Sequence, residues 1–133
     1  MSHKNKIHRI PSDMGYPFST AVRVGDRLEL SGQIGLNSST GKLVPGGVGP
    51  ETTQTLKNIE AVLNANGSSM RDVIKVSVFL KDIAEFSEMN TAYGKFFDKQ
   101  DYPARSAVAV AGLALGARVD IECPAMRTET RHL

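Results

Sequence analysis

The sequence predicts an α+β fold in which two helices cover one face of a β-sheet. Three observations predict this fold class. Short stretches have alternating apolar residues, two longer stretches have apolar residues at helical spacing, and Gly or Pro lies between the stretches. The expected order of elements is β-β-α-β-α-β-β. With 133 residues, 41% of them hydrophobic, the chain has the size of one domain with one core, and we expect a single domain over residues 1–133.

The N-terminal part predicts an irregular segment followed by a β-hairpin. Residues 1–17 look irregular, apart from a short edge strand near residues 7–10. Residues 21–24 and 27–34 alternate on either side of a Gly25-Asp26 turn. The inward side chains of the second strand are Leu28, Leu30 and Ile34.

Gly32 falls on the inward face of this second strand. A missing side chain there lets another group approach the backbone closely. Residues 36–49 are polar and rich in glycine, and they predict a loop.

Both helices are indicated by their ends and by an apolar stripe. Pro50 suits the first turn of the first helix, and Gly67 suits its end. Asp82 can cap the second helix, and Glu85 completes the spacing of a capping box. The first stripe is Leu56, Ile59, Val62 and Leu63, and the second is Phe86, Met89, Tyr93, Phe96 and Phe97. We interpret both stripes as core.

Three further strands are predicted, over residues 73–80, 103–111 and 118–123. The first of them directs Ile74, Val76, Val78 and Leu80 to one face. The last two flank residues 112–116, which begin and end with glycine and therefore predict a hairpin. The inward residues of the last strand are Val119, Ile121 and Cys123.

Arg105 interrupts a strand that otherwise consists of small and β-branched residues. Its guanidinium cannot lose its proton to escape burial, so it needs oxygen acceptors. Alternation places Arg105 on one face with Ala107 and Ala109, and the predicted hairpin adds Asp120 and Glu122 to that face. The partner of Arg105 is then either a protein carboxylate such as Glu122 or the carboxylate of a ligand. Cross-strand ion pairs are common, so the pattern alone favours the ion pair.

The sheet face opposite the helices would carry these polar groups, together with Ser31 and Gln33. A small domain can cover a second sheet face by packing it against copies of itself. We therefore expect an oligomer.

The composition argues against several classes of function. Lys and Arg number 16 against 14 Asp and Glu, a net charge of +2 without a basic stripe, which argues against a nucleic-acid partner. Cys123 is the one cysteine and predicts a reducing compartment. The N-terminus lacks the apolar run of a signal peptide and no stretch could span a membrane, so we expect a cytoplasmic protein. His3, His8 and His132 have no metal-ligand spacing, and we expect no metal or cofactor.

Several segments, taken together in this order and spacing, carry a resemblance to a known family. They are residues 17–21, 30–34, 78–82, 90–97, 103–106 and 119–122. Over nearly its whole length the chain resembles the RidA (YjgF) family of reactive enamine/imine deaminases, which act in metabolite damage control. The resemblance implies a chorismate-mutase-like fold and a homotrimer with three pockets between subunits. It also implies hydrolysis of 2-aminoacrylate and its imine tautomer, 2-iminopropanoate, to a 2-keto acid and ammonia, without a cofactor.

The resemblance also assigns roles to residues of this chain. Arg105 would hold the substrate carboxylate, and Asp120 stands where the family has its acid/base glutamate. The remaining substrate-binding positions would be Phe18, Ser31, Gly32 and Ala107.

Four departures from the family pattern bear on this assignment. Asp120 is one methylene shorter than glutamate, and Phe18 lacks the hydroxyl of the usual tyrosine. Ala107 replaces a residue that is often cysteine, and Thr20 replaces the usual glutamine. Two hypotheses therefore stand: an imine deaminase, or a non-catalytic, regulatory binder of small 2-keto or 2-amino acids. A ribonuclease ranks last, because the chain has no basic stripe.

Overall fold

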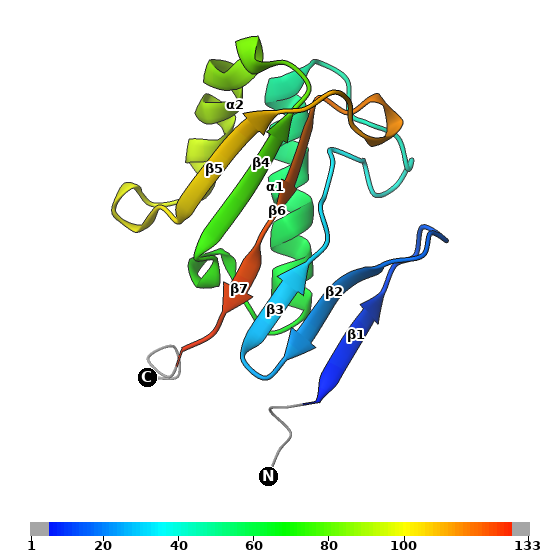
Figure 1. Cartoon of the computed structure of the whole chain (residues 1–133), viewed down its shortest axis with the longest axis vertical. Helices are drawn as coiled ribbons and strands as arrows, with labels where there is room; N and C mark the ends of the chain where they lie inside the picture. Colours follow the sequence, from blue (N-terminus) through cyan, green and yellow to red (C-terminus); the bar gives the residue numbers. More distant parts are fainter. Residues whose placement is uncertain (1–5, 129–133) are drawn as a thin grey trace.

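The computed structural model of the chain describes residues 6–128 (Figure 1). Its helices are α1 (Val48–Ala65) and α2 (Phe86–Tyr93), and short 3-10 turns lie at Met70–Asp72, Ile83–Glu85, Gly94–Phe96, Lys99–Asp101 and Ala114–Gly116. The strands are β1 (Ile7–Pro11), β2 (Ser19–Val24), β3 (Arg27–Leu30), β4 (Lys75–Leu80), β5 (Ala104–Ala109), β6 (Val119–Glu122) and β7 (Pro124–Met126). The α+β class is therefore confirmed.

The strands form two sheets that meet along one stretch of chain. One sheet has the order β1-β2-β3-β7, and the other has the order β5-β4-β6. Strands β6 and β7 follow one another with only Cys123 between them, and isolated bridges join Gln33 to Ile121 and Val73 to Ala125. The C-terminal stretch thus holds the two sheets together, and both helices lie on one side of them (Figure 1).

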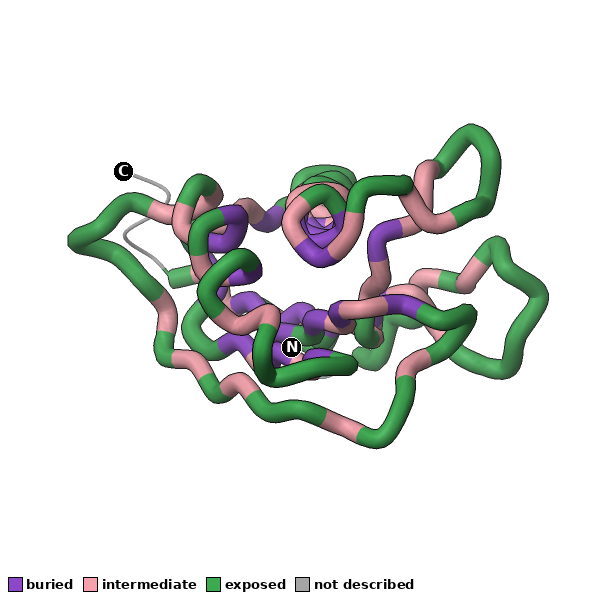
Figure 2. The backbone as a smooth tube through the Cα atoms, turned by 90° about the horizontal axis from the view of Figure 1, so that it is seen from above, coloured by how far each residue is buried: buried purple, intermediate pink, exposed green. Residues whose placement is uncertain are grey.

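The core lies between the helices and the strands, where the buried segments face each other (Figure 2). Most of the predicted stripe residues supply it: Leu56, Ile59 and Leu63 from α1, and Met89 and Tyr93 from α2, are all buried. Val62, Phe86, Phe96 and Phe97 are only partly buried, and the last two lie beyond the end of α2. The strands contribute Leu28, Leu30, Val76, Val78, Leu80, Val119, Ile121 and Cys123. Ile74 departs from the prediction, because it precedes β4 and is exposed.

The N-terminal prediction is largely confirmed. β1 is an edge strand paired with β2, and β2 and β3 form the hairpin, with Val24 opposite Arg27. The second strand is shorter than expected and ends at Leu30, so Ile34 lies outside it. The Asp82 cap is confirmed in part: its carboxylate accepts a hydrogen bond of 2.9 Å from the backbone N–H of Ala84, but it caps the 3-10 turn Ile83–Glu85 that leads into α2 and not α2 itself.

The predicted hairpin across residues 112–116 is wrong. β5 pairs with β4 in parallel and β6 pairs with β4 antiparallel, so β4 lies between the two strands that were expected to be neighbours. Alternation shows which residues of one strand share a face, but it does not show which strand lies beside it. In addition, Val108 of β5 lies on the sheet face opposite the buried Ile121 of β6, so the apolar faces of these two strands do not coincide as expected. No helix within residues 6–128 is long and apolar enough to cross a membrane.

Candidate functional site

The predicted site residues form two groups on opposite faces of the sheet. In the β5-β4-β6 sheet, Val76 is opposite Arg105, and Val78 lies between Ala107 and Ile121. Side chains alternate along a strand, so Arg105 and Ala107 lie on the face of the buried Val78 and Ile121. Asp120 is opposite Phe79 and lies on the other face. The expectation that Arg105 shares a face with Asp120 and Glu122 is therefore wrong.

Arg105 lies against α2. Its guanidinium carbon is 4.8 Å from the ring centroid of Tyr93 and 5.6 Å from that of Phe86. Ala107, on the same face, packs against the core. Arg105 is half-buried, and within residues 6–128 it has neither an ion pair nor a side-chain hydrogen bond.

The predicted ion pair between Arg105 and Glu122 does not form. Glu122 is opposite Ser77, on the other face of the sheet, and is exposed. The three ion pairs of the described chain join Arg27 to Glu29, Arg118 to Glu85 and Arg127 to Asp26. Within residues 6–128, no protein carboxylate pairs with Arg105, which leaves the carboxylate of a ligand as its expected partner.

Asp120, Gly32 and Ser31 form the second group, and Phe18 is an exposed side chain just before β2, next to the residue that Ser31 contacts. A Cβ atom added to Gly32 would overlap Oδ1 of Asp120 and lie 3.2 Å from its Cγ, so the carboxylate lies directly against this glycine. Ser31 donates a 2.5 Å hydrogen bond from its hydroxyl to the carbonyl oxygen of Ser19, the residue after Phe18. The predicted close approach at Gly32 is confirmed, although Gly32 follows β3 rather than lying within it.

The surroundings of Asp120 raise its pKa to about 6. Burial is the larger cause, because it disfavours the charged carboxylate, and the negative charge of Glu122 adds to it. A carboxyl group with a pKa near neutrality can both accept and return a proton at cellular pH. On this ground, too, Asp120 is a candidate acid/base residue.

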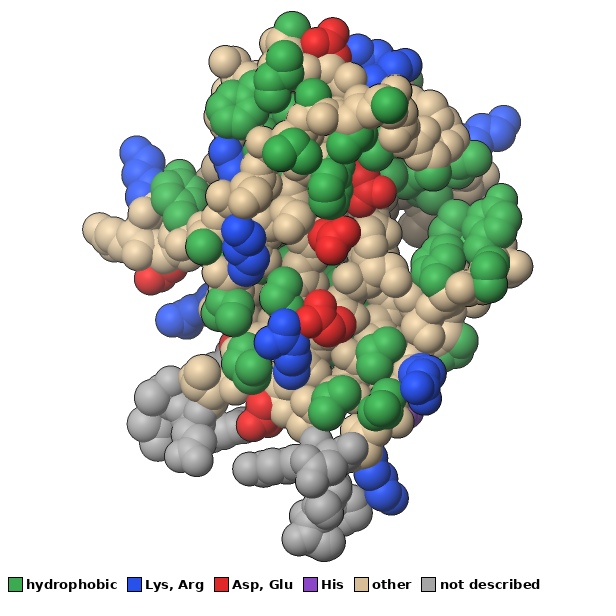
Figure 3. Space-filling view, viewed as in Figure 1, with side chains coloured by type: hydrophobic (Ala, Val, Ile, Leu, Met, Phe, Trp, Pro, Cys, Tyr) green, Lys and Arg blue, Asp and Glu red, His purple; other side chains and the backbone are tan. Residues whose placement is uncertain are grey.

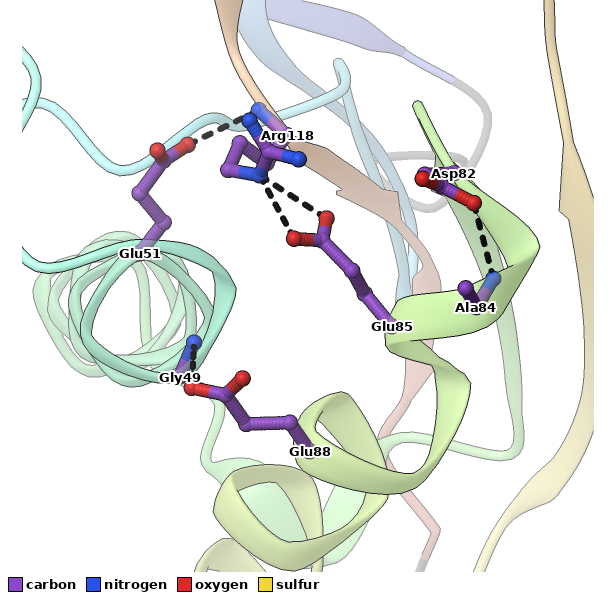
Figure 4. A network of polar contacts seen from close by, with 7 residues as sticks. All are labelled: Gly49, Glu51, Asp82, Ala84, Glu85, Glu88 and Arg118. Atoms are coloured by element: carbon purple, nitrogen blue, oxygen red, sulfur yellow. Dashed lines mark hydrogen bonds and ion pairs between the residues drawn. The ribbon is translucent and has the colours of Figure 1, made fainter.

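The strand that carries Asp120 is fixed at its start by a polar network (Figure 4). The backbone N–H of Arg118 donates to Glu51 of α1, at 2.9 Å. The guanidinium of Arg118 donates to both oxygens of Glu85, at 2.8 Å each. Helix α1 and the 3-10 turn before α2 therefore hold the chain two residues before Asp120. The sequence suggested Glu85 for a capping box, whereas its carboxylate binds Arg118.

Replacing Gly32 with alanine is expected to impair the site without unfolding the protein. The new methyl group would overlap Oδ1 of Asp120 and displace that side chain rather than the backbone. A displacement of about 1 Å in a catalytic group can cost on the order of 10²-fold in rate. We expect the rate of the reaction that Asp120 serves to fall by about that factor, while the circular dichroism spectrum and the melting temperature change little. An unchanged rate in a folded Gly32→Ala protein would contradict this placement of Asp120.

Sequence reasoning missed the aromatic contacts of Arg105. Phe86 and Tyr93 were interpreted as core, and Tyr93 is indeed only 5% exposed. Their spacing of seven residues on α2 places both on one helix face, but only the packing of α2 beside β5 brings Arg105 to them.

A groove of about 550 Å³ lies between the helices, and its lining includes Thr53, Lys57, Thr91 and Lys95. None of the predicted site residues lines this groove.

The sheet face that carries Asp120 is not covered by a helix. Viewed from this side, hydrophobic side chains lie interspersed with acidic and basic ones, and positive charge does not gather in a stripe (Figure 3). Val108, on this face of β5, is 48% exposed. Such a face suits contact with another copy better than contact with a nucleic acid.

Comparisons with known proteins agree with the fold. The model of the family described as "Endoribonuclease L-PSP" matches residues 10–127. A human protein named 2-iminobutanoate/2-iminopropanoate deaminase is 42% identical over 119 residues, which are 90% of this chain and 85% of the relative.

Solved structures from Escherichia coli match closely as well. The YjgF gene product superposes with a TM-score of 0.81 at 35% identity, over 90% of this chain and 94% of the other. TdcF with bound serine gives a TM-score of 0.81 at 37% identity and the same two coverages. The family model matches most of the chain, and the relatives are between 35% and 42% identical to it. The chain therefore belongs to the RidA/YjgF/L-PSP family.

Proposed function

We propose that this protein hydrolyses small 2-imino acids, of the 2-aminoacrylate/2-iminopropanoate class, to 2-keto acids and ammonia. The observation that carries the proposal is Arg105, a half-buried cation with no carboxylate partner in residues 6–128. A permanent cation in that position is matched by a carboxylate that the ligand brings. The names of the relatives support this reaction, and the serine bound to TdcF supports a small carboxylate ligand.

The site is shared between two subunits of a homotrimer. Arg105 faces α2 and Asp120 faces Gly32, on opposite sides of one sheet, so one subunit cannot bring both to a small substrate. Arg105 and Ala107 of one subunit would meet Asp120, Gly32, Ser31 and Phe18 of the partner subunit. Val108 and Phe79 on the uncovered face favour such a contact, because their burial would stabilise the assembly.

The proposed reaction needs orientation and proton transfer. Arg105 holds the substrate carboxylate in a bidentate pair and so fixes the adjacent imine carbon. Asp120 of the partner subunit, ionised above a pH of about 6, takes a proton from water as the oxygen bonds to that carbon. It then returns the proton to the nitrogen, and collapse of the resulting carbinolamine releases ammonia and leaves the 2-keto acid. The chemistry requires only these residues and water.

The direct test is the decay of 2-aminoacrylate, generated from an amino acid in the assay and measured by competition with a trapping amine. We expect wild type to accelerate the decay and Arg105→Ala to abolish that acceleration. Arg9→Ala is a matched control, because Arg9 is an exposed arginine on β1, outside both groups of site residues. Equal activity of wild type and Arg105→Ala would refute the role of Arg105.

A binder without catalysis is the alternative, since Asp120 is shorter than the glutamate the family pattern has there. In that case wild type would bind pyruvate through Arg105 but would not accelerate decay, and Asp120→Glu would gain activity. Hydrolysis by wild type excludes this alternative.

A further inference from the structure

We propose that Tyr93, assisted by Phe86, is a positioning residue that orients Arg105 for the substrate carboxylate. This inference rests on the proposed function and names the part of α2 on which carboxylate binding depends. Tyr93 acts through Arg105 and is not itself a catalytic residue.

The two rings hold the guanidinium by cation–π contact. The guanidinium carbon lies 4.8 Å from the Tyr93 centroid and 5.6 Å from the Phe86 centroid, both within the roughly 6 Å range of this interaction. Because α2 presents both rings on one face, they restrict the side chain from the same side. A long, flexible side chain is thereby held with fewer conformations before the ligand arrives.

An aromatic support suits a ligand-binding arginine better than an acidic one would. A carboxylate partner would occupy the N–H groups of the guanidinium fork, whereas a ring contacts its flat face and leaves the N–H groups along its edge free. Arg105 has no ion pair in the described chain, which agrees with this arrangement.

Tyr93 is itself rigidly held and uncharged. It is buried in the core and packs against Phe97, with ring centroids 5.0 Å apart. Burial raises the pKa of its phenol to about 12, and the opposing effect of the Arg105 charge is smaller. The residue therefore offers Arg105 a neutral ring at neutral pH and not a phenolate.

The test is calorimetric binding of pyruvate, which has the carboxylate of the product and does not depend on turnover. We expect Tyr93→Leu to raise the Kd for pyruvate by about 3- to 30-fold, the range of a partly desolvated cation–π contact. Tyr93→Phe keeps the ring and should bind as wild type does. Phe86→Leu should also raise the Kd, but by less than Tyr93→Leu does. Because Phe86 is only partly buried, this variant can replace Tyr93→Leu in the test if Tyr93→Leu fails to fold.

Two comparisons separate positioning from a general effect on the core. Phe97→Leu removes an aromatic that packs on Tyr93 without a contact to Arg105, so it should lower the melting temperature and raise the Kd by less than Tyr93→Leu does. In an Arg105→Ala background, Tyr93→Leu should have no further effect on binding, since the two residues act as one unit.

The outcomes distinguish this inference from the proposed function. Arg105-dependent binding that neither Tyr93→Leu nor Phe86→Leu weakens would overturn the inference alone. Absence of Arg105-dependent binding in wild type would overturn the proposed function and this inference with it.

Discussion

Mixing two inactive variants, Arg105→Ala and Asp120→Asn, is expected to restore imine hydrolysis. Each variant alone lacks one half of every site. In the proposed shared site, Arg105 comes from one subunit and Asp120 from the partner subunit, because the two residues lie on opposite faces of the sheet. In randomly mixed oligomers about a quarter of the sites then contain both wild-type residues, and we expect about a quarter of wild-type activity.

The variants would be denatured and refolded together, and activity would be measured alongside the subunit composition, which a tag on one variant reports. The matched control mixes Arg105→Ala with the Arg105→Ala, Asp120→Asn double variant. No subunit of that mixture supplies Arg105, so it should recover nothing. Hetero-oligomers without activity would show that Arg105 and Asp120 do not belong to one shared site.

Replacing Asp120 with asparagine is expected to abolish most of the catalysis and, at neutral pH, to stabilise the fold. Positioned acid/base groups contribute about 10²–10⁴-fold to rate, and we expect a loss of that size. The stabilisation follows from the pKa: about 6 in the folded chain against an ordinary value of 3.8. The ionised carboxylate therefore lowers the free energy of unfolding, and asparagine, which carries no charge, removes this destabilisation.

The sign of the pH dependence follows from the same shift. Above a pH of about 6 the carboxyl group is ionised in the folded and the unfolded chain, and the full burial cost applies. Below 3.8 it is protonated in both, and the cost disappears. Denaturant titrations should thus show the advantage of Asp120→Asn over wild type at pH 7, and it should shrink as the pH falls through 6.

Catalysis by wild type should follow the same ionisation of Asp120. The rate of wild type should rise with pH around a midpoint of about 6, where Asp120 becomes ionised, and Glu122→Gln should lower that midpoint because it removes the neighbouring charge. An asparagine variant that keeps the wild-type rate, or a stability difference that does not change with pH, would contradict the role and the environment assigned to Asp120.

The sequence by itself determined the elements and most of the core. Periods of two and about three and a half residues are local properties, and they correctly predicted that Leu28, Val119 and Ile121 are buried. They also predicted the buried part of the two helical stripes, which is Leu56, Ile59, Leu63, Met89 and Tyr93. The sequence also predicted a helical turn that begins after Asp82 and a helix that ends before Gly67. Both signals are local, because a carboxylate cap and a glycine with positive φ act within a few residues. The matched segments were sufficient to indicate the family.

Only the tertiary structure decided how the strands pair and where the site residues lie. Alternation fixes which residues of a strand share a face but not which strand lies beside it, so β5 and β6 were expected to pair and β4 in fact separates them. The predicted register also assumed that Val108 shares a face with Val119 and Ile121. In the structure Arg105 and Ala107 share the core face with Ile121, so Arg105 lies against the rings of α2 and away from Glu122. The contact of Asp120 with Gly32 likewise joins segments almost ninety residues apart, and only the pairing of Gln33 with Ile121 brings them together.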